Sequence, residues 1–306
     1  MNQIRDRLPE KAKTLFDDIE EGRILGASNH IRMIAEMFVT ISSTITNEPE
    51  ASELVDQVSN YFKKTRGESS YAIVNALNLI GQYIEDAHDS SFAGKVRFGV
   101  SEYFEQEASN ISLVVEYSKA LLDQYQTLMV FDYSSTVDKV LKAMDKCRNV
   151  IIPESRVING GYPFVRSCAE KGYHIHFIPD SDMLTVLKEV DAAVIGAETF
   201  YPDGTAFNTA GSDILAELCQ SRKIPYYVLT PLLKADPRSM QGIFKKKITR
   251  NEEDSLAASW PEELRNRVDF NAVELVAIPP EQITAYVTEK GILTPSQLFT
   301  VLYERK

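Results

Sequence analysis

Apolar residues recur with the spacing of an α-helix from about Leu8 to Tyr125. Each stripe of this pattern would lie along one face of a helix and bury that face against its neighbours. The three clearest stripes run from Ile24 to Phe38, from Ala72 to Tyr83 and from Ile111 to Leu122. The breaks between helices fall at Asn47 and Pro49, at Gly67 and at Asp89-Ser90-Ser91. This half is predicted to fold as a helical bundle.

The pattern changes at Thr127, where short apolar runs begin to alternate with amphipathic segments. Strands are predicted at Thr127–Phe131, Asn149–Ile152, His174–Ile178, Ala192–Ile195 and Tyr226–Leu229, with a final strand at Ala272–Ala277. Strands joined by crossover helices favour a mostly parallel sheet with helices on both faces. We therefore predict an α/β protein with a helical bundle domain at residues 1–124 and a Rossmann-like, doubly wound sheet domain at residues 125–306.

Composition narrows the class of protein. The chain is 44% hydrophobic and 25% charged, as in an ordinary globular protein, and its net charge of −11 argues against charge-driven binding of nucleic acid. Cys147, Cys168 and Cys219 are an odd number without metal-ligand spacing, which predicts buried, reduced thiols and no metal site. No run approaches the roughly 20 apolar residues of a membrane span. We expect a cytoplasmic protein that needs no cofactor.

In sheets of this kind, ligands bind beyond the carboxyl ends of the strands. The first predicted strand leads to Asp132 and Ser134, the second to Arg156 and the fourth to Glu198. Arg156 stands before Gly160-Gly161 and a helix, and a cation beside glycines and a helix N-terminus suits a phosphate. Gly211-Ser212 opens another helix whose free amides could hold an anion, and Lys234 follows the fifth strand. These residues are candidates for one site.

Each candidate also has a structural interpretation. Asp132 and Asp180 are of a type that more often caps helices or forms turns, and Ser134 is a good N-cap. Arg156 could simply pair with Glu154. Glu198 is harder to explain as surface, because it follows the buried Gly-Ala end of a strand. The convergence of the candidates on one sheet edge carries more weight than any single residue.

Short motifs run in order through nearly the whole chain. They are Gly26-Ala27, Thr65-Arg66 with Asn75-Ala76-Leu77, Glu154-Ser155-Arg156 with Gly161, Asp180-Ser181, Gly196-Ala197-Glu198, Asp203-Gly204, Asn208 with Gly211-Ser212, and Pro279-Pro280 with Val287–Ile292. This series resembles the family that unites the alpha, beta and delta subunits of translation initiation factor 2B with methylthioribose-1-phosphate isomerase and ribose-1,5-bisphosphate isomerase.

The resemblance implies roles for individual residues. The family's isomerases clamp the phosphate of a sugar and move a proton between neighbouring carbons, with a Cys after the first strand and an Asp after the fourth as the acid–base pair. Asp132 and Glu198 stand at these two catalytic positions. The implied ligand-binding residues are Gly26, Ala27, Arg66, Ser134, Arg156, Asn208, Thr209 and Lys234. Thr209 replaces a family Lys, and Leu25 replaces a family Arg.

These departures favour a binding protein of the initiation factor 2B type, since the subunits of that factor also lack the Cys. Two lost cations weaken anion binding by ~1.5–3 kcal/mol each. A Glu in place of an Asp moves the carboxylate by about 1 Å, which can cost about a hundredfold in rate. We therefore expect a protein with a regulatory or assembly role that binds a phosphorylated sugar or nucleotide.

Two alternatives remain open. In the first, Asp132 and Glu198 form a rewired acid–base pair of an aldose–ketose isomerase, because two carboxylates in one pocket can split their pKa values. In the second, the chain is a structural interaction protein whose pocket is blocked by Tyr133, Phe200 and Tyr201. The family resemblance also implies pairing through the α/β domain, as a homodimer or hexamer, and leaves a translation factor open as a partner.

Overall fold

The computed structural model describes residues 3–24, 26–146 and 148–304 of the 306-residue chain. These residues form two compact units, one of Met1–Ser109 with Leu233–Ala235 and one of Asn110–Leu232 with Asp236–Lys306. The division falls inside helix α6 (Phe92–Leu122), which spans 31 residues. The boundary predicted after residue 124 marks the change of hydrophobic period, which lies just beyond the end of this helix.

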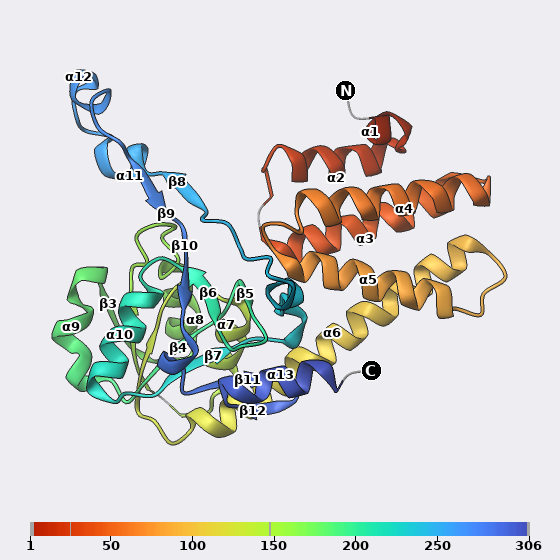
Figure 1. The fold of residues 1–306 in the computed structure, drawn as a ribbon. Coiled ribbons are helices and arrows are strands. Elements are labelled where there is room, and N and C mark those ends of the chain that lie inside the picture. The colour runs from red at the N-terminus through yellow and green to blue at the C-terminus, as the bar shows by residue number, and fades with distance from the viewer. Residues whose placement is uncertain (1–2, 25, 147, 305–306) are drawn as a thin grey trace. The chain divides into compact units, whose positions relative to one another are not determined.

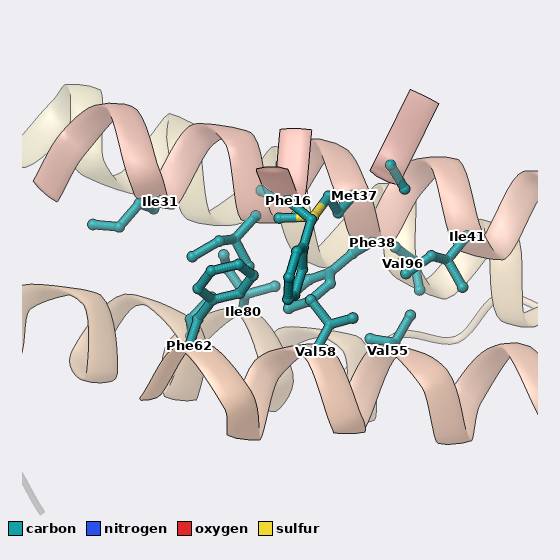
Figure 2. Close-up of a cluster of buried hydrophobic side chains, with 14 of the residues drawn as sticks. Phe16, Ile31, Met37, Phe38, Ile41, Val55, Val58, Phe62, Ile80 and Val96 are labelled. Atoms are coloured by element: carbon teal, nitrogen blue, oxygen red, sulfur yellow. The ribbon is translucent and has the colours of Figure 1, made fainter. Parts of the chain in front are cut away.

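The first unit is the predicted helical bundle. Its helices before α6 are α1 (Gln3–Arg7), α2 (Glu10–Glu20), α3 (Ala27–Thr44), α4 (Glu48–Thr65) and α5 (Tyr71–Asp86). Phe16, Phe38 and Phe62 are buried in one apolar cluster between α2, α3 and α4 (Figure 2). Each fully buried side chain of this size contributes roughly 1.5–3 kcal/mol to folding. The apolar stripes read from the sequence are therefore the faces that build this core.

Two asparagines fix local structure in this unit. Asn47, read from the sequence as a break, is the N-cap of α4, where its side chain accepts a hydrogen bond from the Glu50 backbone N–H. Asn75 on α5 donates through Nδ2 to the carbonyl oxygens of Leu233 at 2.7 Å and Ala235 at 2.9 Å. These two bonds attach the segment Leu233–Ala235 to the helical unit, although it follows the fifth predicted strand in the sequence.

The second unit is built on a seven-stranded sheet with the order β12-β11-β7-β4-β1-β2-β3. Figure 1 shows this unit with its helices around the strands. Its strands are β1 (Thr127–Val130), β2 (Asn149–Pro153), β3 (His174–Ile178), β4 (Ala192–Ile195), β7 (Tyr226–Leu229), β11 (Ala285–Thr288) and β12 (Gly291–Leu293). All neighbouring strands pair in parallel except β11 and β12. Five of these strands were predicted from the sequence to within one residue at each end.

Helices connect the parallel strands, as expected for a doubly wound fold. They are α7 (Ser135–Ala143), α8 (Tyr162–Glu170), α9 (Met183–Val186) and α10 (Ser212–Arg222), with 3₁₀ turns η1 (Asp180–Asp182) before α9 and η2 (Leu187–Glu189) after it. A second apolar core joins these helices to the central strands, where Leu128, Val150 and Ala192 are fully buried. The predicted mostly parallel, Rossmann-like fold is confirmed.

The prediction that Ala272–Ala277 forms the final strand of the main sheet is wrong. The segment Ala272–Ala277 is divided between β9 (Asn271–Val273), which pairs with β8 (Thr249–Asn251), and β10 (Leu275–Ile278), which pairs with β6 (Ala206–Thr209). β6 in turn pairs with β5 (Thr199–Phe200). The last two strands of the main sheet are instead β11 and β12. An apolar run predicts a strand but contains no information about which sheet takes it up.

The remaining elements are short helices. They are α11 (Glu253–Ala257), α12 (Glu262–Arg265) and α13 (Pro295–Tyr303), with 3₁₀ turns η3 (Leu232–Lys234), η4 (Pro237–Gln241) and η5 (Pro280–Gln282).

Cys168 and Cys219 are buried and not disulfide-bonded, as predicted, whereas Cys147 lies outside the described residues. None of the helices described is long and apolar enough to cross a membrane.

Candidate functional site

The polar candidates gather where the strand order reverses. The chain builds β1, β2 and β3 toward one edge of the sheet, then returns to place β4 on the other side of β1. The switch point therefore lies between β1 and β4, and the crevice beyond the carboxyl ends of these strands is where such folds bind ligands. Asp132 follows β1 and Glu198 follows β4. The topology thus puts the two predicted catalytic carboxylates beside the switch point.

Asp132 is buried and held by two hydroxyl groups. Asp132 is only 5% exposed. Its backbone φ is 59°, which is unusual for a residue other than glycine. Thr209 at the end of β6 donates from Oγ1 to Asp132 Oδ2 at 2.8 Å, and Ser155 donates from Oγ to Oδ1 at 3.4 Å. Strained backbone of this kind persists where the surroundings fix it, often at functional sites.

Burial raises the pKa of the Asp132 carboxyl from 3.8 to about 6. The hydrogen bonds from Thr209 and Ser155 favour the carboxylate and oppose this rise, as does the backbone N–H of Tyr133. The negative charge of Glu198 acts in the other direction and raises the pKa further. A carboxyl that titrates near neutral pH can both hold and release a proton, which is the requirement for a general acid or base.

The loop after β2 passes directly beside this carboxylate. A Cβ atom on Gly160 would lie 2.0 Å from Asp132 Oδ1, so only glycine lets the backbone approach this closely. The loop is anchored by Asp180, whose carboxylate accepts the backbone N–H groups of Ser155 and Arg156 at 2.8 Å each. The structural interpretation of Asp180 as a turn residue is therefore the one that its contacts support.

Arg156 lies in the same loop after β2, and its side chain is at the surface. Its side chain is 54% exposed, and its guanidinium group pairs with Glu154 at 3.3 Å. Exposed pairs of this kind contribute little to stability, with a typical value of about 0–1 kcal/mol. A phosphate could replace Glu154 as the partner at small cost. The pairing with Glu154, one of the two interpretations drawn from the sequence, is present and leaves the guanidinium accessible.

Sequence reasoning missed a second cation of the site, Lys245. Partial burial lowers the pKa of its ammonium group, and the nearby carboxylates of Glu198 and Asp236 oppose the shift. The backbone N–H of Lys245 donates to the buried Tyr201 hydroxyl at 2.6 Å, which fixes this part of the chain beside β5. Lys245 lies 47 positions after Glu198 in the run Lys245-Lys246-Lys247, and nothing in that run distinguishes one lysine from the others.

Other predicted residues have structural contacts. Ser134 is the N-cap of α7, and Gly196 lies against it, since a Cβ there would meet Ser134 Oγ at 2.4 Å. Asn208 is buried and donates through Nδ2 to Ser212 Oγ at 2.9 Å. Of the amides expected to be free at Gly211-Ser212, the Gly211 N–H is not, because it donates to the Asp213 carboxylate at 3.1 Å. The acidic residue in the first turn of α10 competes with an anion there.

The remaining predicted ligand residues lie in the helical unit. Gly26 is the N-cap of α3, with a φ of 95°, and Ala27 is the first residue of that helix. Arg66 donates through Nη2 to the Ile19 carbonyl at 2.7 Å and to Glu20 Oε1 at 3.2 Å, so its charge already has a partner. Lys234 is the last residue of η3. Leu25 lies outside the described residues. The ligand-binding roles of these residues stay predictions.

The aromatic residues named as pocket-blocking pack against other rings. Phe200 contacts Tyr286, with ring centroids 5.3 Å apart, and Tyr201 contacts Phe207 at 4.7 Å. Tyr133 is 44% exposed and lies against Phe164 at 5.4 Å. These contacts place Phe200 and Tyr201 in the core.

In the part of the chain that the structure describes, no group of three or more His, Cys, Asp or Glu residues could hold a metal ion.

The fold and the site together define a two-unit α/β protein with a buried carboxyl at the switch point of a parallel sheet. The sequence profile of the initiation factor 2 subunit family matches residues 23–295 of the chain. The chain belongs to this family, and the resemblance seen in its motifs is confirmed.

Relatives of both functional types are similar over nearly the whole length. A translation initiation factor eIF-2B subunit 2-like protein of Pyrococcus furiosus is 23% identical over 291 residues, which cover 94% of this chain and 98% of that protein. A ribose 1,5-bisphosphate isomerase of Archaeoglobus fulgidus is 22% identical over 300 residues, covering 97% and 94%. The solved 5-methylthioribose 1-phosphate isomerase of Pyrococcus horikoshii has the same fold, with a TM-score of 0.75 at 18% identity, covering 99% of this chain and 92% of that one.

Proposed function

We propose that the chain binds a phosphorylated sugar or nucleotide at the carboxyl edge of its parallel sheet, as an initiation factor 2B-like protein with a regulatory or assembly role. The observation that carries this proposal is the loop after β2. The same loop packs Ser155 against the buried Asp132 carboxyl and presents the guanidinium group of Arg156 to solvent. Hydroxyl and carboxyl groups suit the sugar, and an exposed guanidinium group suits the phosphate.

An acidic chain can bind an anionic ligand only if basic side chains lie at the binding site. The chain carries a net charge of −11, and Asp132 and Glu198 add local negative charge. Arg156 has one acidic partner on its own loop, and Lys245 lies near Glu198. We infer that Arg156 and Lys245 together hold the phosphate, with Lys245 supplying a charge that Thr209 no longer provides at the family's lysine position.

The Arg156→Ala variant is expected to weaken binding of a phosphorylated ligand about 10- to 150-fold, because a charge-assisted hydrogen bond contributes about 1.5–3 kcal/mol. The measurement is a thermal-shift screen with ribose 5-phosphate, ribose 1,5-bisphosphate, methylthioribose 1-phosphate and AMP, followed by calorimetric titration of each hit. Arg166→Ala is the matched control, since Arg166 is an exposed arginine that pairs with Glu170 on α8. If none of the four probes shifts the unfolding temperature of the unmodified protein, the binding proposal is wrong.

A second function is favoured by one specific observation, the raised pKa of Asp132 beside Glu198. On this proposal the chain is an aldose–ketose isomerase of the ribose-1,5-bisphosphate or methylthioribose-1-phosphate type. One carboxyl would hold a proton while the other accepts one, which is the division of roles that a proton transfer between neighbouring sugar carbons requires. Asp132, whose pKa is raised by burial despite the hydrogen bond from Thr209, is the better proton holder. Glu198, at the end of β4, is the base.

Assembly completes the proposal. Pairing through the α/β domain, as a homodimer or hexamer, would allow a bound metabolite to act on quaternary structure. A cytoplasmic location is part of the proposal, and a translation factor stays open as a partner; both rest on the family resemblance alone. A net charge of −11 supports the expectation that direct binding to nucleic acid plays no part.

A further inference from the structure

Two motifs of the sequence have no role in the candidate site. They are Asn75-Ala76-Leu77 in α5 and Val287–Ile292, which includes the turn between β11 and β12. They belong to different units of the molecule. One polar side chain of each motif, Asn75 in the first and Glu289 in the second, nevertheless forms hydrogen bonds with the same short stretch of backbone after β7. We call this stretch, residues 232–236, the Lys234 segment.

Asn75 holds the middle of the Lys234 segment. Its Nδ2 donates to the carbonyl oxygen of Leu233 at 2.7 Å and to that of Ala235 at 2.9 Å. Both partners are acceptors, so the two hydrogens of the amide group are used on the residues directly before and after Lys234. Leu233 also packs against the apolar core of the helical unit, and Ala235 is buried. Asn75 therefore fixes the backbone on both sides of Lys234.

The two ends of the Lys234 segment are held by the α/β unit. At its start, the Leu232 N–H donates to Glu289 Oε2 at 2.9 Å, and Glu289 is buried. At its end, the Asp236 N–H donates to the Phe200 carbonyl at 2.8 Å. Burial of a carboxylate is unfavourable unless the group is hydrogen-bonded, so packing alone would not place a glutamate at position 289. Groups from three distant parts of the chain thus hold one segment of five residues.

Lys234 is the one basic residue of this segment, and it is among the residues expected to bind the ligand. A lysine ammonium group sits on a flexible four-carbon stem, so the place where its backbone is held decides which phosphate it can reach. We propose that Asn75 and Glu289 are positioning residues that hold Lys234 for the phosphate of the ligand. This inference rests on the proposed function. It adds that a residue of the helical unit sets the affinity for the phosphorylated ligand.

The first test is a double-mutant cycle between Asn75 and Lys234. Calorimetric titration gives the dissociation constant of ribose 5-phosphate, ribose 1,5-bisphosphate, methylthioribose 1-phosphate and AMP. Lys234→Ala and Asn75→Ala are each expected to raise the constant about tenfold, because both remove the same charge-assisted contact. Combining them should raise it by less than about twofold beyond Lys234→Ala alone. A merely structural role of Asn75 would lower the unfolding temperature without this dependence on Lys234.

Glu289 is tested with a pair of variants. Glu289→Ala removes the acceptor of the Leu232 N–H and is expected to weaken binding about tenfold, whereas Glu289→Gln keeps an oxygen that can accept this bond and should stay within about threefold of the unmodified protein. Asn78→Ala is the matched control for Asn75→Ala, since Asn78 is an exposed asparagine on the same helix. It should bind the probes like the unmodified protein.

Hydrogen exchange without ligand shows whether the variants act locally. Amides of residues 232–236 should exchange faster in Asn75→Ala and Glu289→Ala than in Asn78→Ala, while the strands of the main sheet keep their protection. Unchanged affinity in both Asn75→Ala and Glu289→Ala, or a loss in Asn75→Ala that adds fully to that of Lys234→Ala, would overturn this proposal and leave the binding proposal intact. If no probe binds the unmodified protein, the proposed function fails and this inference fails with it.

Discussion

If the chain is an isomerase, its turnover of ribose 1,5-bisphosphate or methylthioribose 1-phosphate is expected to fall at least about a hundredfold in the Asp132→Asn variant, because a positioned general acid or base contributes typically 10²- to 10⁴-fold. The amide can still accept a hydrogen bond from Thr209, so the local structure should be kept while the proton is lost. Glu198→Gln should cause a loss of the same order. Turnover is measured with saturating substrate by following conversion of the aldose to the ketose.

The pH profile identifies which residue holds the proton. Burial raises the pKa of Asp132 to about 6, so its protonated form falls tenfold for each pH unit above that value. If protonated Asp132 is the acid, turnover should decrease with the same slope above about pH 6. Asp182→Asn is the control, since Asp182 is an exposed aspartate outside the site and its replacement changes the net charge equally.

The same variants separate the two proposed functions. A binding protein would show thermal shifts with phosphorylated ligands, no turnover in the unmodified chain, and shifts that persist in Asp132→Asn. An isomerase would lose turnover in both carboxyl variants while keeping ligand binding that depends on Arg156. Full turnover in Asp132→Asn and Glu198→Gln would refute the isomerase mechanism. This comparison is necessary because the chain has the fold of both kinds of protein.

Much of the fold was accessible from the sequence, because each buried parallel strand is a short apolar run between turn residues. Strands β3, β4 and β7 were predicted with their observed ends. Which strands become neighbours depends instead on contacts far apart in the chain. The segment Ala272–Ala277 shows this, since its two halves pair with β8 and β6 and not with the main sheet.

The sequence predicts the candidate site only in part. The rule for switch points places Asp132 and Glu198 together once the strand order is known. The bond from Thr209 to Asp132 joins residues 77 positions apart, and the nearness of Lys245 to Glu198 depends on the packing of a later segment against Tyr201. Sequence spacing cannot predict such contacts. The contact between the Asp213 carboxylate and the Gly211 N–H could have been predicted from the sequence, since an acidic residue in the first turn of a helix often accepts backbone N–H groups.

The Asp132→Asn variant is also expected to be more stable than the unmodified protein at neutral pH, independently of any substrate. The folded-state pKa of Asp132 is raised from 3.8 to about 6 by burial. A group with a raised folded-state pKa favours folding fully below its unfolded pKa, and this contribution is lost as the pH rises through the folded pKa. Each unit of difference corresponds to 1.36 kcal/mol, so the ionised carboxylate costs about 3 kcal/mol above pH 7.

An asparagine does not ionise, so it avoids this cost at neutral pH. The free energy of unfolding, measured with urea between pH 4 and pH 7, should therefore show an advantage of Asp132→Asn that grows by about 2 kcal/mol over this range. Thr209→Val should act in the opposite direction, because losing the hydroxyl donor raises the pKa of Asp132 further and increases the cost at neutral pH. Asp182→Asn provides the control for net charge. A difference between Asp132→Asn and the unmodified protein that stays constant with pH would show that Asp132 is not held in a destabilising, proton-retaining environment, and the acid role proposed for it would then lose its physical basis.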